Sequence, residues 1–292
     1  MIRAEALVFQ YPDGTEALHD VNLEIRDSEV MALMGANGCG KTTLLKHLIG
    51  LLKPSSGRVW LDGKYMRTMK DEEIFRQVGM VFQDPNDQLF AATVEQDVAF
   101  GAANLGLSSS EISRRTTEAL KMVDATQLVG RAIHTLSFGQ KRRIAIAGVL
   151  AMQPRVMLLD EPTSGLDPRS IGAIMRLLRK LNRDKGISML MATHDVELVP
   201  LFCDRVAIMK HGTVVATGPP SDILPDTAVM RDAELRLPRV AHLAEILHKR
   251  DGAAFSRMPL TIGEARREIC KLLAANPTRA TWRSQTNESE KR

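Results

Sequence analysis

One segment near the start of the chain has the residue types needed to hold phosphate groups. Gly35 to Thr42 match the pattern G-x-x-x-x-G-K-[ST], between a strand-like run at Val30–Met34 and a helix-like run at Thr43–Ile49. Glycines let the backbone N–H groups wrap around phosphate oxygens, and the N-terminus of the following helix adds a favourable dipole. In this pattern Lys41 bridges the β- and γ-phosphates, and the Thr42 hydroxyl binds Mg²⁺. The expected nucleotide-binding residues are Gly35, Ala36, Asn37, Gly38, Cys39, Gly40, Lys41, Thr42 and Thr43.

A second segment supplies carboxylates of the kind that phosphoryl transfer needs. The run Val156–Leu159 is wholly apolar and is followed by Asp160 and Glu161. A buried strand of this kind places Asp160 at its C-terminal end beside the phosphate loop, where it can hold Mg²⁺ through water. Glu161 then lies within reach of an attacking water and is the candidate general base. Together the two segments predict a P-loop nucleotide hydrolase.

The elements around these motifs indicate an α/β fold. Strand-like runs are separated in several places by helical patterns, which favours a largely parallel sheet. These runs are Ala6–Phe9, Val30–Met34, Val78–Phe82, Val156–Asp160, Ser188–Ala192 and Val206–Met209. Strand-like segments at Ile2–Phe9, Val21–Ile25 and Arg58–Leu61 suggest an antiparallel part beside this core. The stretch Thr93–Met152 has helical periodicity and predicts a helical insertion.

The composition suits one large domain with at most a small appendage. The chain has 292 residues, of which 44% are hydrophobic and 25% charged, which is ordinary for a globular protein. A net charge of +4 and an aromatic content of 4% suit a protein that handles phosphates, and we expect no nucleic acid partner. Three scattered cysteines without a C-x-x-C pair argue for a reducing cytosol and against a zinc site. The longest apolar stretch, Ile144–Met152, is half of a membrane span, and Arg3 and Glu5 interrupt any secretory signal.

A third motif separates this chain from other nucleotide hydrolases. Leu136–Gln140 reads LSFGQ and is followed by three basic residues. This motif resembles the LSGGQ signature of ABC ATPases, in which the signature of one subunit caps the γ-phosphate held by another. The resemblance implies a dimer with two ATP molecules at the interface, touched by Ser137, Gly139 and Gln140. Phe138 stands where the family usually has glycine, which we expect to alter local packing only.

The remaining motifs of the family follow in the expected order. By resemblance, Tyr11 stacks on adenine, and Gln83, at the end of the run Val78–Phe82, senses Mg²⁺, water and a transmembrane partner. Ser164–Asp167 resembles the loop that couples the two sites of a dimer, and His194 resembles the switch histidine that contacts the γ-phosphate. The resemblance therefore implies catalytic roles for Glu161, His194, Gln83 and Lys41, and metal contacts from Thr42, Gln83 and Asp160. A P-loop kinase or GTPase would share the phosphate loop but has no use for the other motifs.

Finer similarity points to one branch of the family. The segments Pro85–Phe90, Thr93–Gly101, Asn104–Leu107 and Ala145–Met152 closely resemble energy-coupling-factor ATPases, nearest to the CbiO-like ATPases of cobalt and nickel importers. The resemblance implies a transmembrane coupling subunit, whose helix docks beside Gln83–Phe90, and a substrate-capture membrane subunit. It also implies a peripheral location on the cytoplasmic side of the inner (plasma) membrane. Import of a vitamin, or a soluble ABC ATPase without a transport role, remain alternatives, as do a homodimer and a mixed pair.

The resemblance and the composition together divide the chain into three parts. Residues 1–224 are expected to form the ABC ATPase domain, with a helical signature subdomain at about 84–153. Residues 225–277 are expected to be a helical region that helps to hold a dimer together, with an amphipathic stretch at Ile262–Leu273. The last segment, 278–292, is polar and is expected to be disordered.

Overall fold

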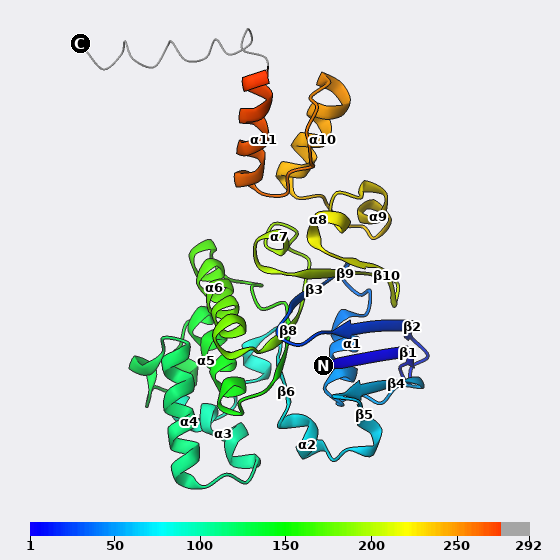
Figure 1. The fold of residues 1–292 in the computed structure, drawn as a ribbon. Helices are drawn as coiled ribbons and strands as arrows, with labels where there is room; N and C mark the ends of the chain where they lie inside the picture. The colour runs from blue at the N-terminus through cyan, green and yellow to red at the C-terminus, as the bar shows by residue number, and fades with distance from the viewer. Residues whose placement is uncertain (276–292) are drawn as a thin grey trace, which may run out of the picture.

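The computed structural model describes residues 1–275 and consists of two β-sheets with helices packed around them (Figure 1). The tail expected at 278–292 lies outside the described residues. The division of the chain at residue 224 stays a prediction, although one observation bears on it. Buried residues on both sides of that position share one apolar cluster, in which Met34 and Ile208 of the core lie with Met230, Leu235 and Leu260.

The larger sheet has six strands in the order β10-β9-β3-β8-β7-β6. The strands are β3 (Val30–Met34), β6 (Val78–Val81), β7 (Val156–Asp160), β8 (Ser188–Thr193), β9 (Arg205–Lys210) and β10 (Thr213–Gly218). All neighbours are parallel except β10, which runs antiparallel to β9. Every residue of β3, β6, β7 and β8 is buried, as expected of a parallel sheet covered on both faces. The expected parallel core is confirmed except for Ala6–Phe9, which lies in the smaller antiparallel sheet. β10 was not anticipated, because only three of its residues are consecutively apolar and none of its residues is fully buried.

The smaller sheet is antiparallel and confirms the expectation for the N-terminal part. Its order is β2-β1-β4-β5, with β1 at Ile2–Gln10, β2 at Glu16–Ile25, β4 at Ser56–Leu61 and β5 at Lys64–Tyr65. Side chains from this sheet and from helix α1 (Lys41–Leu48) form one apolar cluster with the inner face of the parallel sheet. The phosphate-loop segment therefore lies where the two sheets meet.

The helical insertion is confirmed as three helices, α3 (Val94–Asn104), α4 (Ser109–Met122) and α5 (Phe138–Ala151). Both α3 and α5 begin with a capping box, in which the N-cap hydroxyl and the Gln side chain three residues later bond to each other's backbone N–H. Their apolar faces pack together with α6 (Pro168–Lys185) in a second cluster. Two short helices lie elsewhere: α2 (Asp71–Phe75) packs in the cluster of the antiparallel sheet, and Val199 of α7 (Val199–Phe202) is buried in the cluster that contains Met230 and Leu235.

Four helices follow the last strand: α8 (Pro220–Ile223), α9 (Thr227–Asp232), α10 (Arg239–Asp251) and α11 (Ile262–Ala275). The last two lie side by side at the end of the molecule farthest from α3 and α4 (Figure 1). Within residues 1–275, no helix is both long and apolar enough to span a membrane.

Candidate functional site

The phosphate loop follows the buried strand β3 in the middle of the sheet and leads directly into α1. Gly40 has φ of 106°, a left-handed conformation that glycine adopts without steric cost. Gly35 leaves no room for a side chain, because a Cβ there would collide with the Met209 carbonyl and the Cys39 sulfur. Helix α1 has no side-chain cap, so its first N–H groups are available to an anion.

Lys41 and Thr42 occupy the positions that the motif predicts, at the start of α1. The Lys41 ammonium donates to the carbonyls of Gly35 (2.8 Å) and Ala36 (3.0 Å), so it lies within the curve of the loop. The Thr42 hydroxyl donates to a carboxylate oxygen of Asp160 at 2.7 Å. Burial raises the pKa of Asp160 above its ordinary value, and the Thr42 bond acts in the opposite direction. A hydroxyl and a buried carboxylate side by side are hard oxygen ligands of the type that Mg²⁺ takes, and a cation here would favour the ionised carboxylate.

Glu161 and His194 come together from two neighbouring strands. Nδ1 of His194 lies 2.9 Å from Oε1 of Glu161. The glutamate side chain is buried, with 7% exposed, whereas the histidine side chain is 61% exposed. Glu161 has a φ of 44°, a strained value for a residue with a side chain and one that clusters at functional sites. A buried carboxylate bonded to an accessible imidazole can take a proton from a water molecule and orient it.

The strand order explains why these residues meet. Asp160 ends β7, Thr193 ends β8, and Met34 ends β3, and these three strands are consecutive in the sheet. Met34 is level with Thr193, and Asp160 with Ala192. The carboxyl ends of parallel strands share one edge, which is where α/β proteins bind ligands.

Tyr11 and Gln83, which the resemblance assigns to the site, make contacts with the protein itself or lie exposed beyond a strand. The Tyr11 hydroxyl is 2.9 Å from Oγ1 of Thr43, and the Tyr11 ring packs edge-on against Phe9. Gln83 is exposed and lies two residues beyond the end of β6 at Val81, so the expected strand end at Phe82 was one residue too long. The roles of Tyr11 and Gln83 stay predictions.

The signature motif forms the beginning of α5, apart from the phosphate loop. Ser137 is the N-cap and accepts a bond from the Gln140 N–H, while the Gln140 side chain accepts from the Ser137 N–H. Phe138 lies against Gly165 of the loop before α6, where an added Cβ would come within 3.0 Å of the ring. Within residues 1–275, no hydrogen bond or ion pair joins residues 136–140 to residues 35–42. In one copy the two motifs are therefore not joined by a direct polar contact.

Arg142 is a structural link that the sequence analysis missed. Its side chain has no exposed surface and donates to the carbonyls of Phe82 (2.7 Å) and Gln83. Burial lowers the pKa of this guanidinium, and the charges of Asp84 and Asp160 oppose that shift. Arg142 thereby ties the signature helix to the segment that carries Gln83. The spacing of residues along the helix could have predicted that Arg142 is buried. It lies three and four residues before Ala145 and Ile146, which are buried on the same face of α5.

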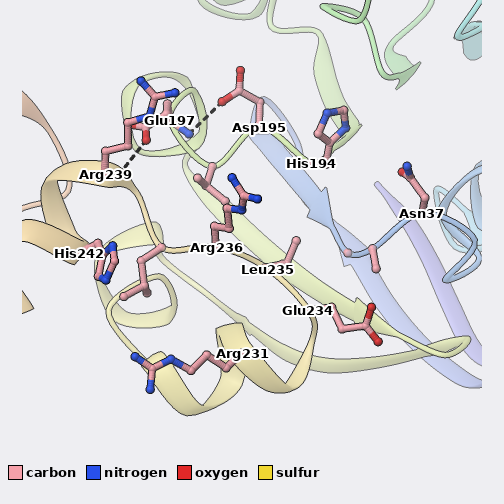
Figure 2. Close-up of a pocket in the computed structure, with 14 residues that line it drawn as sticks. Asn37, His194, Asp195, Glu197, Arg231, Glu234, Leu235, Arg236, Arg239 and His242 are labelled. Atoms are coloured by element: carbon pink, nitrogen blue, oxygen red, sulfur yellow. Dashed lines mark hydrogen bonds between the residues drawn. The ribbon is translucent and has the colours of Figure 1, made fainter.

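A pocket of about 960 Å³ opens beside the phosphate loop (Figure 2). One wall consists of Gly35, Ala36 and Asn37, and a second of residues 194–197 that follow β8. The third wall comes from the segment between α9 and α10, including Arg236 and the first residue of α10, Arg239. The C-terminal segment therefore borders the candidate site, which the sequence did not indicate.

Comparisons with known proteins agree with this geometry. The family model for the ABC transporter matches residues 18–164. The chain is 48% identical to the energy-coupling factor transporter ATP-binding protein EcfA2 of Clostridium perfringens, over 92% of this chain and 95% of that protein. It is 46% identical to the corresponding EcfA protein of Methanocaldococcus jannaschii, over 94% and 98%.

Two solved structures are also similar. CbiO1 from Clostridium perfringens, described as part of the ABC transporter complex cbiONQ, has a TM-score of 0.72 and 46% identity, over 84% of this chain and 98% of that one. The ATP-binding cassette MJ0796, dimeric in a post-hydrolysis state with ADP and Pi, has a TM-score of 0.68 and 31% identity, over 75% and 99%.

Proposed function

Because this chain belongs to the ABC transporter family, as an ATP-hydrolysing subunit of the energy-coupling-factor type, we propose that the importer it energises carries cobalt or nickel ions. The observation that carries this choice is the 46% identity to CbiO1, over 84% of this chain. Selection of the metal would lie in the membrane subunits. Within residues 1–275, no three His, Cys, Asp or Glu side chains are grouped so that they could hold a metal ion. Import of a vitamin is the second candidate.

Uptake by the complete transporter tests this proposal. Cells that contain the membrane subunits with either the wild-type chain or Glu161→Gln are given labelled Co²⁺, Ni²⁺ or a vitamin in separate assays. ATP-dependent accumulation of Co²⁺ or Ni²⁺ that is lost in the variant is the expected result. Loss of vitamin uptake alone would overturn the metal assignment in favour of the vitamin importer. No effect on any solute, with the chain absent from membranes, would favour a soluble ABC ATPase.

Within the site, we propose that Glu161 is the general base and that His194 aligns it and contacts the γ-phosphate. The 2.9 Å contact between them supports this pairing. Lys41 would exchange its two loop carbonyls for phosphate oxygens when ATP binds. Mg²⁺ would neutralise charge on the phosphates and would be held by Thr42 and Asp160, with Gln83 nearby.

We propose that hydrolysis takes place in a dimer, with each ATP between residues 35–42 of one copy and the signature of the other. The lack of any hydrogen bond or ion pair between the two motifs within residues 1–275 supports this arrangement. The start of α5 also suits a phosphate, since its first turn has no acidic residue and its N-terminus attracts anions. Ser137, Gly139 and Gln140 would then approach the γ-phosphate of the partner copy, while Tyr11 stacks on adenine in its own copy.

The C-terminal region, 225–277, is proposed to strengthen that dimer. Helices α10 and α11 present an apolar pocket of about 410 Å³ between them. Several large apolar side chains of these two helices are exposed, namely Leu243, Ile246, Ile262, Ile269 and Leu273. An exposed apolar face of this kind is typical of an interface. Leu243→Asp, at an exposed position, should weaken dimerisation more than ATP binding, and equal dimerisation by sedimentation would contradict this role.

A groove beside Gln83–Phe90 is proposed to receive a helix of the transmembrane coupling subunit. Phe90 is 65% exposed, and its ring packs edge-on against Phe100. The buried carboxylate of Asp97 fixes this edge by accepting the N–H groups of Phe90 and Ala91. The chain would thus sit peripherally on the cytoplasmic side of the inner (plasma) membrane. Phe90→Ser should release it from membranes that contain the coupling subunit without weakening ATP binding, and retention on those membranes would count against this groove.

A further inference from the structure

The loop that carries His194 is linked to the C-terminal region by a series of hydrogen bonds. Thr193, at the end of β8, accepts the Asp195 N–H at 3.1 Å, and the Asp195 carboxylate accepts the Glu197 N–H at 3.0 Å. The Glu197 carboxylate then accepts the backbone N–H of Arg239 at 2.8 Å. Figure 2 shows the last two of these bonds. The series begins in the parallel sheet, passes the switch histidine and ends at the first residue of α10.

Helix α10 depends on this bond because its own N-cap cannot supply one. The N-cap is Pro238, and no side chain from the helix itself caps it. The Arg239 N–H belongs to the first turn, whose N–H groups have no partner inside the helix. Glu197 supplies the acceptor from 42 positions earlier in the chain, and its charge is favourable at a helix N-terminus.

Apolar packing reinforces the same connection. Val196 and Val199, which flank Glu197, are buried in the cluster that also contains Leu235 and Ala241 of the C-terminal region. The loop after β8 is therefore held on one side by the C-terminal segment. The His194 side chain is 61% exposed, and the bond to Glu161 is its only hydrogen bond to a residue within 1–275. Its position is set mainly by the backbone of this loop.

We infer that Glu197 is a positioning residue for ATP hydrolysis, which holds His194 in place by fixing its loop to the N-terminus of α10. The inference rests on the role of His194 proposed above. It makes turnover dependent on where the C-terminal region sits, because a shift of α10 would move the loop. ADP would be held by the phosphate loop proposed above, so its binding should not depend on Glu197.

The structure offers a way to remove the link without changing the loop. Arg239→Pro deletes the N–H that Glu197 accepts, and proline is favoured at the first position of a helix. Residue 238 already has the extended conformation that must precede a proline, with φ of −49° and ψ of 138°. Arg239→Ala is the matched control, because it removes the same side chain and keeps the N–H. Glu197→Ala and Glu197→Gln form the second pair. Glu197→Gln is the control, because the glutamine oxygen can still accept the N–H of Arg239.

The test measures kcat and KM for ATP, and the affinity for ADP, of the full-length chain. Loss of one capping bond should lower kcat roughly 5- to 30-fold in Arg239→Pro and in Glu197→Ala. KM and ADP affinity should stay within about 2-fold of wild type, since mutations of positioning contacts lower kcat selectively. Arg239→Ala should keep a higher kcat than Arg239→Pro, and Glu197→Gln a higher kcat than Glu197→Ala. Amide hydrogen exchange at residues 194–198 should rise only in the two impaired variants.

The comparison of the proline and alanine variants of Arg239 decides whether Glu197 acts through its bond to α10. Normal kcat in Arg239→Pro, or equal losses in Arg239→Pro and Arg239→Ala, would overturn the inference. Parallel losses of kcat and ADP affinity would also overturn it, because they indicate general destabilisation. If His194→Ala turns over ATP normally, the proposed role of His194 fails instead. With His194→Ala impaired, adding Glu197→Ala should cause little further loss, and an additive loss would mean that Glu197 does not act through the histidine.

Discussion

Replacing Arg142 by methionine should destabilise the fold, even though it removes a buried charge. The variant loses two hydrogen bonds from a charged donor to the carbonyls of Phe82 and Gln83, just after β6, worth roughly 1.5–3 kcal/mol each after desolvation. It also removes the buried Nε, which has no bonding partner within residues 1–275 and costs roughly 1–3 kcal/mol. Methionine fills a similar volume, so the net loss should be about 2–3 kcal/mol.

Thermal unfolding followed by circular dichroism would measure this loss. For a chain of 292 residues the Tm should fall by roughly 3–5 °C. Arg143→Met is a matched control, because Arg143 is the next residue of the same helix, with a side chain 32% exposed and 3.8 Å from Asp124. A surface pair of that kind contributes at most about 1 kcal/mol, so its Tm should change little.

An unchanged or higher Tm for Arg142→Met would refute this reasoning. It would mean that burying the guanidinium costs more than its two bonds contribute, as happens for some buried ion pairs. One of these bonds holds the Gln83 carbonyl. At temperatures where the wild type and the variant are both folded, the variant should therefore lose more ATP turnover than nucleotide affinity.

Three further substitutions test the proposed site. Glu161→Gln should keep ATP binding while lowering turnover by roughly 10²–10⁴-fold, and near-normal phosphate release would exclude it as the base. Ser137→Arg should place a bulky charged side chain where the partner's phosphate would lie and block ATP-driven dimerisation, which sedimentation would detect. If that variant still dimerised with ATP, the two-copy arrangement would be wrong. Lys41→Ala removes the only ammonium bonded within the phosphate loop of residues 1–275, so ATP affinity should fall, and an unchanged Kd by calorimetry would contradict the phosphate assignment.

Local motifs in the sequence contained most of the candidate site, because each motif is a short continuous segment with its own flanking elements. Gly35–Thr42 follows strand β3 and includes the first two residues of helix α1, so the predicted strand, loop and helix occur in that order. Val156–Asp160 is a buried strand that ends in acids, and residues 136–140 begin a capped helix. These features depend on neighbouring residues, so local pattern was sufficient to find them.

Contacts between distant segments were decided by the tertiary structure. Nothing in the order of the motifs specifies that β8 lies between β3 and β7, which is what brings His194 to Glu161. The buried Arg142 donates to the carbonyl of Phe82, which is 60 positions away in the sequence. Glu197 accepts the N–H of Arg239, which is 42 positions away. A charged residue in a loop or helix reads as a solvated surface group when only its neighbours are known. Its partner is set by how strands and helices pack in space, and the sequence carries that information only through the fold as a whole.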